Sequence, residues 1–178
     1  MSRQGTADLG TEAADYFEPF TRAVASACMR EGRTASTVSA DGRIGVYGLT
    51  VVEFARLADR YGYGEATPER LVRGPLQHDL SRALLSEHWR REIRWVRDNV
   101  RHPEAMIPTA AERATRSWLA DRAAVQAGIG TRSYTADPER FVESVLRGMG
   151  LEAQTVCEPI QTTARRAIGD EGLSLSPA

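Results

Sequence analysis

The chain has 178 residues, 42% of them hydrophobic and 26% charged, with a formal net charge of −1. This composition is typical of one globular domain with a hydrophobic core, and the balanced charge argues against nucleic acid or an anionic membrane surface as a partner. No apolar run reaches transmembrane length, and the first residues lack the pattern of a secretory signal. We therefore expect a protein that is made in the cytoplasm and does not span a membrane.

The first part of the chain predicts one long helix followed by a β-hairpin. Residues 1–13 are expected to form a flexible arm. Apolar residues recur at three- and four-residue steps over 14–30, which indicates a helix with one buried face. Gly32 is a natural end for this helix. The dipeptide Asp41-Gly42, between residues that tolerate β-structure, is a strong hairpin signal.

The rest of the chain is predicted to be helical. Thr50, with Glu53 three positions later, forms a capping box and so marks a helix start. Further capping and helix-breaking signals divide the remaining sequence. Helices are expected at 51–61, near 67–70, and at 76–100, 109–127, 138–148 and 155–168. The prediction is a mainly α domain over 14–150 with a small β-hairpin, followed by a C-terminal helix and tail over 151–178.

Two acidic residues are candidates for catalysis. Glu31 follows an apolar helix face, where a carboxylic acid can keep its proton and donate it to a leaving oxygen. Asp41, in the hairpin, could activate water, act as a nucleophile or stabilise a cationic intermediate. Tyr47 and Thr50 lie where the hairpin returns, and their hydroxyls could bind a sugar or orient that water. The alternatives are a surface role for Glu31 and a purely conformational role for Asp41.

Metal and disulfide chemistry are not indicated. Two cysteines, Cys28 and Cys157, are too few for a disulfide framework, although one bridge between them stays open. His78, His88 and His102 are spaced too far apart to converge on a metal ion, and the sequence has no Cys/His cluster. We expect neither a metal nor a cofactor.

The order of the candidate residues resembles the catalytic segment of the lysozyme superfamily. Glu31-Gly32 followed by residues 38–50 is similar to soluble lytic transglycosylases, which have Glu-Ser-x and then Val-Ser-x-x-Gly-x-x-Gly-Leu-Met-Gln. It is also similar to phage-type muramidases, which have Glu-Gly-Gly and then Gly-x-x-x-Tyr-Gly-Ile-Thr. Residues 87–94 and 123–130 resemble two downstream segments of the muramidases, so the resemblance covers roughly 17–150.

This resemblance implies a lysozyme-like helical domain, with the hairpin beside a cleft, that cleaves the glycan strand of peptidoglycan. Glu31 would be the catalytic acid. If Asp41 is too far from the scissile bond, a transglycosylase outcome needs no second carboxylate, because the sugar's own hydroxyl closes an anhydro ring. Action at the cell wall or in the periplasm would need delivery by a phage tail, a secretion apparatus or a holin-like partner.

Two departures from the family pattern keep other functions open. Arg33 places a cation close to Glu31, and Gly48 stands near the position of the transglycosylase Gln. An active enzyme requires Glu31 in an open groove that faces the hairpin. An inactive lysozyme-like protein, built into a phage-tail or secretion assembly, would allow Glu31 to be capped or paired with Arg33. A helical regulatory or binding module is the third alternative.

Overall fold

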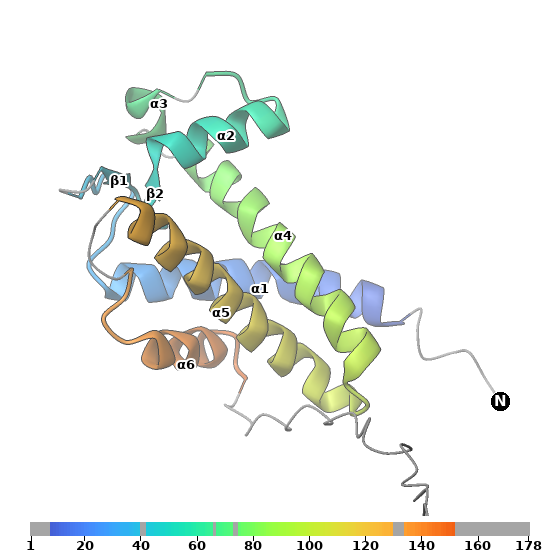
Figure 1. Ribbon diagram of the computed structural model, residues 1–178. Coiled ribbons are helices and arrows are strands. Elements are labelled where there is room, and N and C mark those ends of the chain that lie inside the picture. Colours follow the sequence, from blue (N-terminus) through green and yellow to red (C-terminus); the bar gives the residue numbers. More distant parts are fainter. Residues whose placement is uncertain (1–7, 40–41, 66, 73–74, 130–133, 152–178) are drawn as a thin grey trace, which may run out of the picture.

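The computed structural model describes residues 8–39, 42–65, 67–72, 75–129 and 134–151. This part of the chain forms six α-helices and one two-stranded antiparallel sheet (Figure 1). The elements are α1 (Asp8–Arg30), β1 (Arg43–Ile44), β2 (Leu49–Thr50), α2 (Val51–Tyr61), α3 (Pro68–Val72), α4 (Pro75–Asn99), α5 (Pro103–Ile129) and α6 (Pro138–Gly148). The prediction of a mainly α fold with a small β-hairpin is confirmed.

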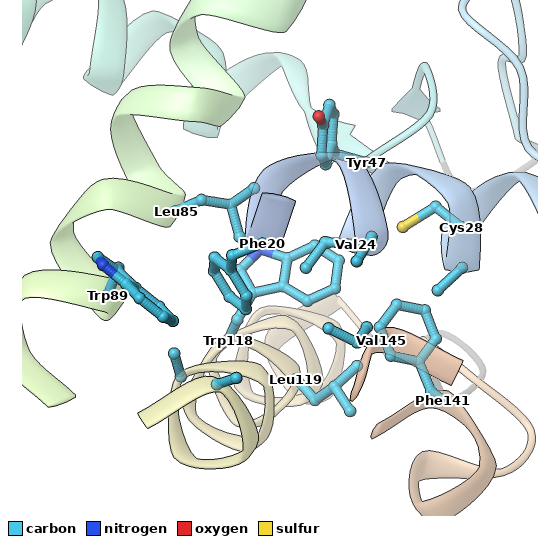
Figure 2. Close-up of a cluster of buried hydrophobic side chains, with 14 of the residues drawn as sticks. Phe20, Val24, Cys28, Tyr47, Leu85, Trp89, Trp118, Leu119, Phe141 and Val145 are labelled. Atoms are coloured by element: carbon cyan, nitrogen blue, oxygen red, sulfur yellow. The ribbon is translucent and has the colours of Figure 1, made fainter. Parts of the chain in front are cut away.

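The core lies where four helices meet. The long helices α4 and α5 pack against each other, and α6 packs on both α1 and α5 (Figure 1). Aromatic side chains fill the centre (Figure 2): the rings of Phe20 and Trp89 stack with 4.9 Å between centroids, and Trp118 lies 5.8 Å from Phe141. The indole nitrogen of Trp89 donates to the carbonyl of Ala13 at 3.0 Å, so its burial leaves no unpaired donor.

Two helices begin earlier than the sequence predicts. Helix α1 starts at Asp8, so residues 8–13 are helical, while the rest of the predicted arm lies outside the described residues. Helix α5 starts at Pro103 and continues through Pro108, where the sequence predicted the start of the helix. Burial of Ile107 and Ala110 on either side of Pro108 accounts for this continuity, because their packing offsets the lost backbone bond.

The β-structure contains two turns in place of the single predicted one. At the first, the Gly42 N–H donates to the Ser39 carbonyl at 2.9 Å, and Val38 bridges Ile44, so the chain reverses where the sequence placed the turn. At the second turn, which connects β1 to β2, the Gly48 N–H donates to the Gly45 carbonyl at 3.1 Å. We call residues 38–50 the hairpin.

Capping sets the boundaries of the later helices as predicted. Thr50 and Glu53 form the capping box of α2, which ends at Gly62 in a left-handed conformation. The Asp137 side chain accepts the Arg140 N–H at 3.0 Å and so caps α6. The predicted helix 155–168 lies outside the described residues, as does Cys157. Within the described part, none of the helices is long and apolar enough to cross a membrane.

Candidate functional site

Glu31 lies directly after α1, at the end of the helix that faces the hairpin (Figure 1). Its N–H donates to the Cys28 carbonyl at 3.1 Å, and the next residue, Gly32, turns the chain away with φ +82°. The Glu31 side chain is 29% exposed. A solvent-accessible carboxylate is therefore held at the end of a long helix.

Both carboxylate oxygens of Glu31 accept hydrogen bonds. Arg33 Nη2 lies 2.9 Å from Oε2 and forms an ion pair with it. The Thr135 hydroxyl donates to Oε1 from the segment that leads into α6. Pairing with Arg33 was one alternative from the sequence, but the sequence analysis missed Thr135.

Arg33 is itself fixed by several contacts. Its guanidinium lies over the ring of Tyr134, 3.8 Å from the centroid, and Nη2 donates to the Tyr134 carbonyl. The Arg33 Nη1 atom lies 3.8 Å from Cys28 Sγ. The Arg33 side chain is only 14% exposed. The positive charge beside Glu31 is thus a built part of the site and does not depend on a mobile surface arginine.

Tyr134 joins three parts of the fold around this site. Its hydroxyl donates to the Tyr47 carbonyl in the hairpin at 2.7 Å and lies 3.5 Å from Cys28 Sγ in α1. The rings of Tyr134 and of Trp118 in α5 pack in a T-shaped arrangement, with 5.0 Å between their centroids. Burial raises the pKa of Tyr134, and burial likewise raises the pKa of the Cys28 thiol to about 11. Both groups are therefore neutral packing elements at physiological pH.

The hairpin approaches Arg33 and Tyr134 closely because Gly48 has no side chain. A Cβ at Gly48 would lie 3.3 Å from the Tyr134 ring and 3.9 Å from Arg33 Cδ. Gly48 also has φ +57°, which favours glycine. Gly48, which stands near the position of the transglycosylase Gln, thus permits close packing of the hairpin against the site.

Three other site residues were predicted, of which Asp41 lies outside the described residues. Tyr47 is 2% exposed, and burial raises its pKa to about 12. The Tyr47 side chain belongs to the core (Figure 2), and its contact with a sugar stays a prediction.

The predicted substrate role of Thr50 likewise stays a prediction. The Thr50 hydroxyl accepts the Glu53 N–H at 3.3 Å and donates to Glu53 Oε2 at 3.1 Å, so it takes part in the cap of α2. The second oxygen of Glu53 forms an ion pair with Arg122 of α5, whose side chain is 5% exposed. The sequence analysis missed this buried pair, which connects α2 to the helical core.

The described residues contain no group of three or more His, Cys, Asp and Glu side chains that could hold a metal ion. The chemistry available in this part of the chain is that of one exposed carboxylate, oriented by a cation and a hydroxyl, next to a glycine-rich hairpin. Comparisons of the chain with protein-family models, with curated proteins and with solved structures found no match.

Proposed function

We propose that this protein cleaves the glycan strand of peptidoglycan, with Glu31 as the proton donor to the leaving oxygen. The observation that carries the proposal is the placement of Glu31, whose accessible carboxylate is held by Arg33 and Thr135 at the end of α1. A catalytic group needs this kind of orientation by fixed neighbours. The resemblance of residues 31–50 to the lysozyme superfamily suggests the substrate.

The reaction begins with transfer of a proton from Glu31 to the glycosidic oxygen. The bond from that oxygen to the anomeric carbon then breaks, and positive charge develops on the sugar. Attack by water completes a hydrolysis, whereas attack by the sugar's own hydroxyl completes a transglycosylation. In both routes the attacking group loses a proton, and this proton restores the Glu31 carboxylic acid. We assign Asp41 to the support of water or of the cation in the hydrolytic route.

A second function follows from the same ion pair. Arg33 is anchored on Tyr134 and holds Glu31 in the arrangement expected of an inactive relative. In that case the protein is a lysozyme-like structural or interaction component of a phage-tail or secretion assembly.

A glycan-release assay distinguishes the two functions. Purified protein and its Glu31→Gln variant are incubated with cell-wall glycan, and soluble muropeptides are analysed. Glu87→Gln is the matched control, because Glu87 is also paired with an arginine, Arg60, and its side chain is 34% exposed. We expect release by the wild type and by Glu87→Gln but not by Glu31→Gln. If the wild type releases no muropeptides, or if Glu31→Gln releases as much as the wild type, the enzymatic proposal is overturned. Anhydro ends would indicate a transglycosylase, and reducing ends a hydrolase.

A further inference from the structure

Thr135 is a buried polar residue whose hydroxyl reaches the candidate acid from a distant part of the chain. Thr135 is 4% exposed, and its hydroxyl donates to Oε1 of Glu31. A buried hydroxyl is stable when it has partners, and an ionised carboxylate is among the strongest acceptors. The contact therefore joins a fixed donor to a group that reaches solvent.

The start of α6 fixes the Thr135 hydroxyl. Its oxygen accepts the Asp137 N–H at 3.3 Å, and Asp137 is the N-cap of α6. The hydroxyl oxygen is thereby oriented by the backbone. Its single proton has two acceptors within reach, Oε1 of Glu31 and the Asp137 carbonyl at 3.4 Å, and the charged carboxylate is the stronger of the two. The position of Oε1 is thus tied to the segment that leads directly into the N-cap of α6.

Arg33 and Thr135 differ in the protonation states of Glu31 to which they can form a hydrogen bond. The Arg33 guanidinium can only donate, so it matches an ionised oxygen and cannot accept a proton from a carboxylic acid. A hydroxyl can donate to the ionised group and, after rotation, accept from the neutral one. The two oxygens of Glu31 are therefore unequal, and Oε1 is the one whose neighbour accommodates both protonation states.

We infer that Thr135 is a positioning residue for Glu31, which holds Oε1 in place and allows this oxygen to gain and lose the transferred proton. The inference rests on the proposed function of Glu31 as an acid. Loss of the hydroxyl should leave glycan binding intact and slow the chemical step, because the acid is no longer held in its reactive orientation.

The test measures glycan cleavage by the full-length wild type and three variants. Thr135→Val removes the hydroxyl and keeps the shape, and Thr135→Ser restores the hydroxyl. Thr115→Val is the matched control, because Thr115 is fully buried and donates to the Ala111 carbonyl at 2.7 Å, away from Glu31. We expect Thr135→Val to lower kcat by roughly tenfold to a hundredfold with KM nearly unchanged, and Thr135→Ser to recover most of it. An unchanged kcat in Thr135→Val, or an equal loss in Thr115→Val, overturns the inference.

A stability cycle separates this inference from the proposed function. The Tm is measured for wild type, Thr135→Val, Glu31→Ala and the double variant. If the hydroxyl acts through Glu31, Thr135→Val lowers the Tm of the wild type and has a clearly smaller effect in the Glu31→Ala background. If the wild type releases no glycan, the proposed function fails and this cycle alone decides: a non-additive shift supports positioning of Glu31 by Thr135, and an additive shift overturns it.

Discussion

Gln77 occupies the space that a side chain at Gly45 would need. A Cβ at Gly45, which has φ +77°, would lie 1.9 Å from Gln77 Cδ. Gln77 is buried in α4, donates to the carbonyls of Ala35 at 3.1 Å and Leu71 at 3.2 Å, and accepts the Val46 N–H at 3.3 Å. One amide side chain thus attaches the hairpin to the helical core.

Gly45→Ala should therefore destabilise the protein by about 2–4 kcal/mol, because it combines backbone strain with the loss of the Gln77 hydrogen bonds. Chemical denaturation measures the effect. Gly42→Ala is the control: Gly42 has φ +76°, but no atom lies within 4 Å of its Cβ position, so only the strain of about 1–2 kcal/mol applies. Equal losses in the two variants would show that the contact with Gln77 is unimportant.

The Cys28 thiol should be almost unreactive in the folded protein. Burial raises its pKa from 9.0 to about 11, so roughly a hundredfold less thiolate is present near pH 8. We expect very slow labelling of the Cys157→Ser variant by a thiol reagent at this pH and full labelling after denaturation. Rapid labelling of the native variant would mean that the thiol is accessible.

His88 should make the protein less stable as the pH falls. Burial of its ring lowers its pKa below 6.5, with Asp121 acting in the opposite direction. The unfolded chain therefore takes up this proton at a higher pH than the native one, and the free energy of unfolding decreases from about pH 6.5 downward to the native pKa. In the folded protein, the Nε2 atom of His88 lies 3.2 Å from Asp121 Oδ2. Its Nδ1 atom lies 3.1 Å from Arg91 Nη2 and 3.1 Å from Ser117 Oγ.

The His88→Gln variant should show a smaller decrease in stability than wild type between pH 7 and pH 5. Denaturation at each pH measures the two slopes. The same substitution at His102, whose side chain is 71% exposed, serves as the control for a histidine outside the core. A wild-type slope in His88→Gln would contradict the role of the buried ring.

Breaking the buried pair of Glu53 and Arg122 should be costly. Arg122→Met leaves the largely buried Glu53 carboxylate without its cation, which is expected to cost about 3–5 kcal/mol. The Glu53→Gln, Arg122→Met double variant should recover part of this loss, because no charge is left unpaired. Arg97→Met, which removes an exposed pair with Asp98, should have a much smaller effect. Equal effects of Arg122→Met and Arg97→Met would contradict this account.

Local signals predicted the boundaries of the secondary structure well. The capping box of Thr50 and Glu53, the cap at Asp137 and the helix end at Gly32 depend on residues a few positions apart, and the structure confirms all of them. The extension of α5 through Pro108 was not predictable in this way, because it depends on burial against other helices.

The site was only partly predictable for the same reason. Glu31 and Arg33 are close in sequence, so their pairing could be anticipated. Thr135 and Tyr134 reach them from more than a hundred positions away, and nothing in their local sequence marks such a contact. The burial of Tyr47 was not predictable, because a tyrosine can turn its hydroxyl to solvent or bury its whole side chain, and tertiary packing decides which.

The several contacts of Tyr134 restrict how this protein can diversify. Its ring lies against Arg33, and its hydroxyl binds the hairpin, so most substitutions there would change the candidate site and the fold together. Variation that alters the site while preserving the fold is therefore confined to its neighbours. A library randomised at Glu31, whose side chain is 29% exposed, should retain many folded members, whereas one randomised at Tyr134 should retain few.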